Sequence, residues 1–402
     1  MKIRPVILCG GEGTRLWPNS KKNQAKQFIN FGDETLIEKT LKRIKGPIFD
    51  YPILSTNLKY LKKIKKYLKK LKIKKYKIIL EPFKRNTAPA ILASALIKEI
   101  PNNQPLMFLP ADHTIENINL FNKTIFKNKK NLTGKNIFIF GIKPTFPSSD
   151  YGYFLSKKYL KNTNKKVIRF IEKPNKIKAK KIIKMNGYWN SGMFFFRKDA
   201  IIYNFKKFSP NIFKNCNASV KKAKISKNVY YLNKTSFYKV ASKSFDYAIL
   251  EKSNQINAIN LNLPWSDLGS WKEILKQYNK TKTKFFKKKN VYYRPWGKYI
   301  NLFKGKNFLI KELTINSKSS ISLQKHYHRS EFWLITQGKA KITLNKNKFY
   351  KTSGEDIYIP AGTIHRVENL FRKPIKIMES QIGSILKETD IVRFQDVYGR
   401  VI

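Results

Sequence analysis

The sequence predicts an α/β domain with an open, mostly parallel sheet, followed by a smaller all-β domain. Apolar strand-like segments alternate with helix-like segments over the first part of the chain, which is typical of α/β folds. The pattern changes near residue 280, where short strand-like segments separated by Gly, Asn and Ser begin. A length of 402 residues with 42% hydrophobic content is sufficient for two such cores.

The α/β alternation can be followed element by element from the N-terminus. A short apolar strand runs into a glycine turn, and further strands and helices then alternate. Ligands of such sheets bind beyond the carboxyl ends of the parallel strands. The expected strands are residues 3–8, 51–57, 77–82 and 105–113, and the expected helices are residues 34–44, 59–77 and 87–100.

The second domain is separated from the first by a charged segment. Residues 279–291 lack a clear apolar period, and we interpret them as a linker between domains at residues 1–278 and 292–402. The segments after the linker favour a small barrel or sandwich. Its expected strands lie within residues 306–315, 331–344, 355–362 and 375–383.

The formal net charge of +58 comes mostly from lysines that are spread along the chain. The lysine-rich helix 59–77 carries Leu61, Ile64, Leu68 and Leu71 at three- and four-residue steps, so we interpret its lysines as a solvated face. We therefore expect no specific nucleic-acid partner, although the charge should attract anionic substrates.

Cysteine content and hydropathy bear on the compartment. Two cysteines, Cys9 and Cys216, show no paired spacing, which favours a reducing environment. No apolar run approaches the roughly 20 residues of a membrane span, and the N-terminal apolar run is too short for a secretory signal. We expect a cytoplasmic protein without a membrane partner.

The first candidate site is the glycine-rich turn after the first strand. Gly10, Gly11 and Gly13 would let backbone N–H groups approach phosphate oxygens. Arg15 can donate two hydrogen bonds to a phosphate, and Lys26 adds a point charge. The turn matches neither G-x-G-x-x-G nor a P-loop.

The string "GTRLWP" followed by "KQF" resembles the signature of nucleotide-sugar pyrophosphorylases, and most of all that of mannose-1-phosphate guanylyltransferases. This resemblance implies a Rossmann-like nucleotide-sugar transferase domain. Further motifs follow in the family's order. They are "EPFKRNTAPAI" (81–91), "LPADH" (109–113), "YGYF" (151–154), "FIEKP" (170–174), "YWNSGMFFF" (188–196), "SFDYAILEK" (244–252) and "WSDLGSW" (265–271).

The resemblance implies that mannose 1-phosphate attacks the α-phosphorus of GTP and that pyrophosphate leaves. Asp112 and Asp267 would hold Mg²⁺, and Arg15, Lys26 and Lys173 would be the catalytic cations. The implied sugar-phosphate ligands are Gly152, Glu172, Lys173 and Asn190. The implied nucleotide ligands are Gly10, Gly11, Gly13, Thr14, Arg15, Arg85, Asn86 and Asp112.

Three of the four histidines fall in the all-β domain, at positions 326, 328 and 365. The stretches 324–338 and 354–369 resemble the two motifs of the cupin family, a small β-barrel or jelly roll. The resemblance implies that Gln324, His326, Glu331 and His365 hold a divalent metal, Zn²⁺ or similar. His328 projects in the same sense as His326 and is an alternative ligand.

The segments "RPWGKY" (294–299) and "DIVRFQDVYGR" (390–400) resemble the C-terminal domain of bifunctional type II phosphomannose isomerases. The implied second reaction interconverts fructose 6-phosphate and mannose 6-phosphate, with Arg400 as an essential cation. Tyr327 and Phe332 stand where this family has histidines.

The favoured interpretation is a bifunctional enzyme of GDP-mannose supply for polysaccharide biosynthesis. One alternative is a monofunctional guanylyltransferase with a degenerate cupin. Others are a related nucleotidyltransferase that uses another nucleotide or sugar phosphate, and a nucleic-acid-binding protein driven by charge. The segment between Trp271 and Arg294 is shorter than in the family. A homo-oligomer is left open.

Overall fold

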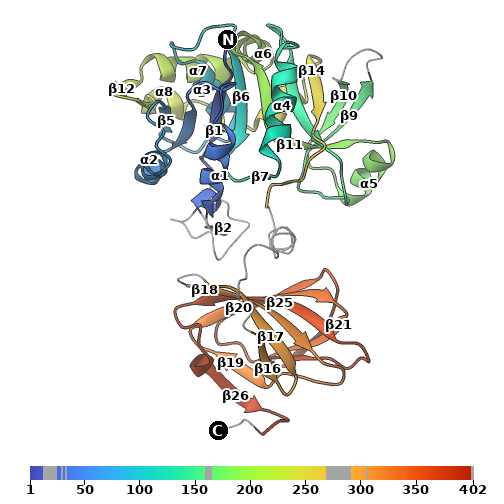
Figure 1. The fold of residues 1–402 in the computed structure, drawn as a ribbon. Helices are drawn as coiled ribbons and strands as arrows, with labels where there is room; N and C mark the ends of the chain where they lie inside the picture. Colours follow the sequence, from blue (N-terminus) through green and yellow to red (C-terminus); the bar gives the residue numbers. More distant parts are fainter. Residues whose placement is uncertain are drawn as a thin grey trace. The chain divides into compact units, whose positions relative to one another are not determined.

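The computed structural model describes residues 1–11, 25–28, 30–31, 34–158, 165–268, 291–304 and 307–399. The chain divides into two units, Met1–Gly269 and Ser270–Ile402 (Figure 1). Each unit has its own core, and each is treated by itself below. Apart from Val291, the expected linker 279–291 lies outside the described residues.

Unit 1 is built on one large sheet flanked by helices, which confirms the α/β prediction, but the sheet is mixed and not mostly parallel, because β11 and the strands β9, β10 and β12 pair antiparallel. Within the described residues it has eleven strands in the order β12-β13-β5-β4-β1-β6-β11-β8-β14-β10-β9. Pairing is parallel from β13 to β6, whereas β11 is antiparallel to both β6 and β8. The strands are β1 (Arg4–Leu8), β4 (Ile53–Asn57), β5 (Lys77–Glu81), β6 (Pro105–Pro110), β8 (Ile137–Ile142), β9 (Tyr153–Lys158), β10 (Lys165–Ile171), β11 (Tyr188–Arg197), β12 (Lys224–Ser226), β13 (Val229–Tyr231) and β14 (Ile256–Asn260).

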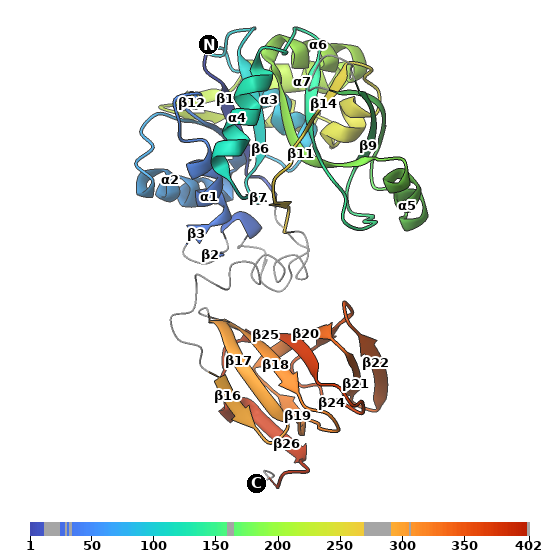
Figure 2. The ribbon, with the colours of Figure 1, turned by 45° about the vertical axis from the view of Figure 1, so that its right-hand side comes forward.

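Helices cover both faces of this sheet (Figure 2). Successive residues of a strand point to opposite faces, and in this sheet both faces carry apolar side chains that the helices bury. Ile7 of β1 packs in the core beneath α1, α2, α4 and α5, whereas its neighbour Val6 packs in the core beneath α3, α6, α7 and α8. The helices are α1 (Leu36–Arg43), α2 (Leu61–Lys70), α3 (Thr87–Ala95), α4 (Ile118–Lys129), α5 (Lys176–Lys184), α6 (Lys198–Phe208), α7 (Pro210–Lys221), α8 (Lys234–Tyr238) and the π-helical segment η4 (Asp246–Leu250).

The lysine-rich helix is shorter than the sequence predicts. It ends at Lys70, and Lys77 already belongs to β5. Ile64 and Leu68 are fully buried on one face, as their spacing predicts, so the lysines lie on the other side of α2.

Short elements complete the described part of unit 1. The 3₁₀ turn η2 places Lys26 in the interior, and α1 begins with a capping box between Thr35 and Glu38. These elements are η2 (Lys26–Phe28), β2 (Asn30–Phe31), β3 (Glu34–Thr35), η3 (Leu58–Tyr60), β7 (Thr114–Ile115) and β15 (Trp265–Ser266).

Unit 2 consists of two antiparallel sheets, as predicted for the C-terminal domain (Figure 1). Within the described residues, one sheet has the order β16-β17-β18-β25-β20-β23 and the other β22-β21-β24-β19-β26. The elements are β16 (Val291–Arg294), β17 (Gly297–Lys304), β18 (Phe308–Ile315), β19 (Leu323–His326), β20 (Arg329–Gln337), β21 (Lys339–Leu344), β22 (Asn347–Thr352), β23 (Asp356–Ile359), β24 (His365–Glu368), β25 (Ile375–Gly383), η5 (Glu388–Asp390) and β26 (Ile391–Gln395).

The core of unit 2 lies between its two sheets. Trp333 and Ile335 of β20 contribute to it, together with Ile377 of β25 and residues of the opposite sheet such as Ile342 and Val367. No helix in the described ranges combines the length and the apolar character that a membrane crossing requires.

Gly297→Ala is expected to destabilise unit 2 by about 2–4 kcal/mol, because the added Cβ would overlap the backbone oxygen of Thr314. The matched control is Gly362→Ala, where a Cβ meets no atom of the described part of the chain within 4 Å. Gly362→Ala should lower the free energy of unfolding by only about 1 kcal/mol, which is the strain of an alanine at a positive φ. Chemical denaturation of both variants measures the difference, and equal losses would contradict the packing argument.

Candidate nucleotide and metal sites

A cavity of about 500 Å³ in unit 1 lies at the carboxyl ends of the parallel strands. Leu8 of β1, Asn57 of β4, Glu81 of β5 and Pro110 of β6 all border it, each at the last position of its strand. The walls also include the five predicted nucleotide ligands that the structure describes. These are Gly10, Gly11, Arg85, Asn86 and Asp112.

The two described glycines of the predicted phosphate turn border open space. A Cβ at Gly10 or Gly11 would meet no atom of the described residues within 4 Å, and both glycines line the cavity. Gly13, Thr14 and Arg15 lie outside the described residues.

Arg85 and Asn86 border the cavity where helix α3 begins. The Asn86 side chain accepts a hydrogen bond from the Thr87 N–H and caps the helix. The Arg85 Nη2 donates to the Tyr238 carbonyl oxygen at 2.6 Å, and the guanidinium lies over the Tyr238 ring. Both residues thus have structural contacts of their own, and they also line the cavity.

Lys26 joins the two predicted metal-binding aspartates. Its buried Nζ donates to Asp112 Oδ2 at 3.0 Å and to the backbone oxygen of Asp267. Asp267 Oδ1 accepts from the Tyr151 hydroxyl at 2.9 Å. The structure therefore brings Lys26, Asp112 and Asp267 together, although they come from distant parts of the chain.

The Asp112 carboxylate is held in its charged form. Burial alone would raise its pKa, but the charges of Lys26 and His113 and the hydrogen bond from Lys26 outweigh burial and lower the pKa. Burial lowers the pKa of the adjacent His113. The ionised carboxylate can bind a divalent cation, and the ammonium group beside it can pair with phosphate oxygens.

Gly152, Glu172 and Asn190 also lie together. A Cβ at Gly152 would contact Glu172 Oε2, and the Asn190 N–H donates to the Gly152 oxygen at 2.8 Å. Lys173 Nζ lies 3.4 Å from Glu172 Oε1, and its side chain is half exposed. The four predicted sugar-phosphate ligands thus form one group.

Asp246 belongs to this group, although it was not among the predicted site residues. It lies in η4 within the "SFDYAILEK" motif, and its Oδ1 accepts from Asn190 Nδ2 at 2.9 Å. Burial, followed by the charge of Glu172, raises the pKa of Asp246 to about 7. Since Asp246 also lines the large cavity, it connects the cavity with the Glu172 group.

Glu81 is a second residue that the prediction missed. It is buried at the end of β5, lines the cavity, and accepts a hydrogen bond from Ser55 Oγ at 2.7 Å. Burial raises its pKa to about 7, although the Ser55 hydrogen bond acts in the opposite direction. The sequence signal was an acidic residue that ends an otherwise apolar strand.

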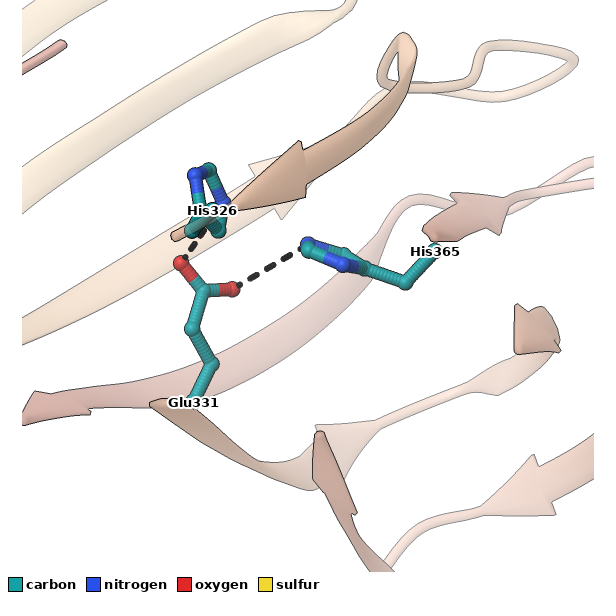
Figure 3. Close-up of side chains that lie close together, drawn as sticks. All are labelled: His326, Glu331 and His365. Carbon is teal, nitrogen blue, oxygen red and sulfur yellow. Dashed lines mark ion pairs between the residues drawn. The ribbon is translucent and has the colours of Figure 1, made fainter. Parts of the chain in front are cut away.

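In unit 2 the structure brings together His326 of β19, Glu331 of β20 and His365 of β24 (Figure 3). Their ligand atoms all lie within 4.8 Å of one another, and all three side chains are buried. His326 Nε2 is 3.1 Å from Glu331 Oε1, and His365 Nε2 is 3.5 Å from Glu331 Oε2. We call these three residues the metal triad.

The outer hydrogen bonds of the two histidines orient them as metal ligands. Nδ1 of His326 faces the Asp390 carbonyl oxygen at 3.2 Å, and Nδ1 of His365 faces the Thr363 carbonyl oxygen at 2.9 Å. A carbonyl oxygen only accepts hydrogen bonds, so each Nδ1 donates its hydrogen outward and each Nε2 faces Glu331, where a bound metal would take the Nε2 lone pair. Within the described residues, His365 Nε2 has no hydrogen-bond partner.

The electrostatics and donor types of the metal triad fit a divalent metal. Burial would raise the pKa of Glu331, but His326 and His365 hold it well below its ordinary value. Gln324 contacts His326 through its amide nitrogen at 3.3 Å, and turning the amide over would present its oxygen instead. Two imidazoles, a carboxylate and an amide oxygen are suitable ligands.

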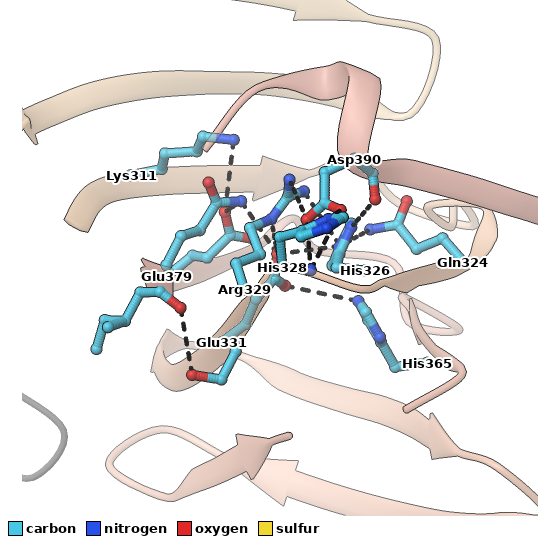
Figure 4. A network of polar contacts seen from close by, with 12 residues as sticks. Lys311, Gln324, His326, His328, Arg329, Glu331, His365, Glu379 and Asp390 are labelled. Carbon is cyan, nitrogen blue, oxygen red and sulfur yellow. Dashed lines mark hydrogen bonds and ion pairs between the residues drawn. The ribbon is translucent and has the colours of Figure 1, made fainter. Parts of the chain in front are cut away.

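His328 and Arg329 take other positions in the polar network around the metal triad (Figure 4). The half-exposed His328 pairs with Asp390 at 2.8 Å and is not part of the triad. Arg329, which the prediction missed, donates to Glu331 Oε1 and to His326 Nε2, both at 3.2 Å. Metal binding would replace these two hydrogen bonds. Arg400 lies outside the described residues.

Comparison with known proteins gives two family matches. The model of the nucleotidyl transferase family matches residues 4–284, and that of the mannose-6-phosphate isomerase C-terminal domain matches residues 280–396. A mannose-1-phosphate guanylyltransferase of Salmonella montevideo is 32% identical, with 99% of this chain and 100% of the relative covered. The alginate biosynthesis protein AlgA of Pseudomonas putida is 30% identical, with 98% and 96% covered.

Two crystal structures also resemble this chain. A mannose-6-phosphate isomerase from Helicobacter pylori has a TM-score of 0.58 and 28% identity and covers 66% of this chain and 100% of its own. A protein of Thermus thermophilus, described as a mannose-1-phosphate geranyltransferase, has a TM-score of 0.60 and 24% identity over 69% of this chain and 80% of its own, and so shares the fold.

The alignment with the Pseudomonas putida relative is longer than this chain. It spans 467 positions, whereas the chain has 402 residues, so the relative carries residues that are missing here. The chain belongs to the nucleotidyl transferase family and continues into a segment that matches the mannose-6-phosphate isomerase C-terminal domain.

Proposed function

We propose that this chain is a bifunctional enzyme of GDP-mannose supply. Residues 1–278 join mannose 1-phosphate to GTP with release of pyrophosphate, and residues 292–402 interconvert fructose 6-phosphate and mannose 6-phosphate. The observation that carries the first activity is the bridge from Lys26 to Asp112 and Asp267 at the edge of the strand-end cavity. The metal triad supports the second activity.

In nucleotidyl transfer, the sugar phosphate oxygen attacks the α-phosphorus of the nucleotide and pyrophosphate leaves. Such a reaction depends on positioning and charge neutralisation. Mg²⁺ held by Asp112 and Asp267 would neutralise phosphate charge. Lys26 stabilises the leaving pyrophosphate together with Arg15, and the amides near Gly10 and Gly11 hold phosphate oxygens.

Glu81 supports guanine as the base. Its buried carboxylate borders the cavity, and a carboxylate accepts hydrogen bonds from the adjacent N1–H and N2–H groups of guanine. Adenine does not present two adjacent donors at that edge. A site that hydrogen-bonds its ligand in this way rejects an analogue that leaves the buried group unpaired.

The Glu172 group supports the sugar phosphate. Glu172, Asn190 and Asp246 offer acceptors and one amide donor for sugar hydroxyls, and Gly152 leaves room for the Glu172 carboxylate. Lys173 is half exposed beside Glu172 and pairs with the phosphate of the sugar.

In unit 2, Gln324, His326, Glu331 and His365 would hold Zn²⁺ or a similar ion, which polarises the substrate carbonyl. The chain's own groups bind the phosphosugar, with Arg400 as a proposed phosphate or oxyanion partner. One observation favours the alternative of a degenerate cupin: Arg329 already donates hydrogen bonds to two atoms of the metal triad.

GTP, mannose 1-phosphate and the two hexose 6-phosphates are the proposed ligands. The cytoplasmic location and the oligomeric state are not needed for these activities and stay predictions.

Asp112→Asn is expected to reduce GDP-mannose formation by at least about 10³-fold, because it removes a charge that neutralises Lys26 and would hold Mg²⁺. Pyrophosphate release from GTP and mannose 1-phosphate measures this activity. Isomerisation by the same variant should stay within twofold of wild type. Loss of both activities in folded protein would contradict the assignment of the two reactions to separate sites.

His365→Ala is expected to lower the zinc content of the protein and to abolish formation of mannose 6-phosphate from fructose 6-phosphate. Mass spectrometry of the metal and a coupled sugar assay measure these two effects. GDP-mannose formation should be retained. If wild-type protein supplied with Zn²⁺ or Co²⁺ shows no isomerisation, the degenerate-cupin alternative holds.

Glu81→Gln is expected to lower kcat/KM for GTP by about 10- to 100-fold and to lower the preference for GTP over ATP, because glutamine keeps the size but loses one acceptor. Turnover with the two nucleotides measures the preference. An unchanged preference would contradict the assignment of Glu81 to the base.

The same variant tests the ionisation of Glu81. Because burial raises its folded-state pKa from 4.5 to about 7, wild type loses stability from this group as pH rises from 4.5 to 7. Glu81→Gln should therefore be more stable than wild type at pH 8, by up to about 3 kcal/mol, and equal to it near pH 4. Glu99→Gln is the control, and its effect on stability at pH 8 should have the opposite sign, so that this variant is less stable than wild type. Hydrogen bonds and the charge of Lys77 lower the pKa of Glu99 despite its burial.

A further inference from the structure

We propose that Glu379, supported by Lys311, is the catalytic base that moves the proton between C1 and C2 of the open-chain hexose 6-phosphate. The inference rests on the proposed isomerase activity of unit 2. It goes beyond that proposal because it assigns the proton transfer to a residue outside the metal triad.

Strand register places Glu379 on the interior face of unit 2. In β25 the core residues Ile375 and Ile377 precede Glu379 and Gln381 at two-residue steps, so all four point to the same side. On the neighbouring strands, Lys311 of β18 is paired with Glu379, and Glu331 of β20 is paired with Gln381. Polar side chains from three adjacent strands therefore lie together at the end of the apolar core.

The contacts of Glu379 connect it with the metal triad. Gln381 Nε2 donates to Glu379 Oε1 at 2.7 Å and to Glu331 Oε1 at 3.0 Å, so one amide group links the two carboxylates. Lys311 Nζ lies 3.6 Å from Glu379 Oε1 (Figure 4). The contacts with Gln381 and Lys311 both involve Oε1 of Glu379. All four side chains line one cavity.

Glu379 is the carboxylate of this cavity that suits proton transfer at carbon. Of the three described carboxylates that line it, Glu331 belongs to the metal triad. Glu388 is half exposed and is held by Arg294 at 2.8 Å and by the Tyr299 hydroxyl at 3.1 Å. The Glu379 side chain is 5% exposed, so a base at this position acts away from bulk water, which would otherwise compete for the proton.

The proposed reaction balances without any further reagent. Glu379 removes the proton from C2 of the aldose, the C2–H electron pair forms the C1=C2 bond, and the carbonyl oxygen O1 takes a proton from the Lys311 ammonium. This gives a neutral enediol. Protonated Glu379 then returns its proton to C1, the O2–H proton passes to Lys311, and C2=O forms. Both side chains end in their starting states, and the product is the ketose.

The test compares full-length Glu379→Gln with full-length Glu388→Gln, the same substitution at another carboxylate of this cavity. Four quantities are measured: zinc content, mannose 6-phosphate affinity by calorimetry, isomerisation, and exchange of the C2 hydrogen in D₂O by NMR. Glu379→Gln should keep its zinc content and its affinity within about threefold, and should lose isomerisation and exchange by about 10²- to 10⁴-fold. Glu388→Gln should lose less than tenfold. Zinc content and mannose 6-phosphate affinity report on the folding of unit 2, and GDP-mannose formation reports on that of unit 1.

Lys311→Gln should retain zinc and reduce isomerisation by about 10- to 100-fold, because O1 loses its proton donor. If zinc-loaded wild type itself fails to isomerise, the proposed isomerase function fails. If wild type isomerises and Glu379→Gln retains exchange, Glu379 is not the base. If Glu379→Gln loses zinc along with activity, its role is structural, and the proposal is also overturned.

Discussion

Both candidate sites depend on one constraint: a charge that leaves water has to be compensated by neighbouring charges or hydrogen bonds. The buried ammonium of Lys26 is compensated by Asp112 and by the backbone oxygen of Asp267. The buried guanidinium of Arg329 is compensated by Glu331 and Asp390. Each compensating group is also a predicted ligand or a neighbour of one. The contacts that stabilise the buried charges are therefore the contacts that position the site residues.

The few acidic residues of this lysine-rich chain are concentrated at the two candidate sites. The sequence has 83 basic and only 25 acidic residues. Nine of the acidic residues nevertheless line or contact the two sites. They are Glu81, Asp112, Glu172, Asp246, Asp267, Glu331, Glu379, Glu388 and Asp390. The net charge of +58 thus describes the surface of the protein, while the sites are rich in carboxylates.

The raised pKa values in unit 1 follow from the same constraint. Glu81 is a buried carboxyl and Asp246 a partly buried one at the strand-end cavity. Burial raises both pKa values, and at Asp246 the charge of Lys173 does not offset burial and the charge of Glu172. Neutral substrate groups such as a base edge or a sugar hydroxyl can pair with such carboxyls, whereas phosphates pair with the cationic part of the site. This division of charge is consistent with a nucleotide and a sugar phosphate that meet at Asp112.

The sequence by itself determined the two modules, the glycine turn, and the clustering of histidines, because these depend on local periodicity and on motif spacing. Only the tertiary structure decided that Lys26 lies between Asp112 and Asp267. It also separated His328 from the metal triad and placed Asp246, Glu81, Arg329 and Glu379 at the sites. Glu81, Arg329 and Glu379 lie in strands whose partners are distant in sequence. A one-residue shift of register would turn these three side chains to the opposite face, and no local pattern specifies that choice. Lys26 and Asp246 lie in a 3₁₀ turn and a π-helical segment, and their contacts depend on how those segments pack against distant parts of the chain.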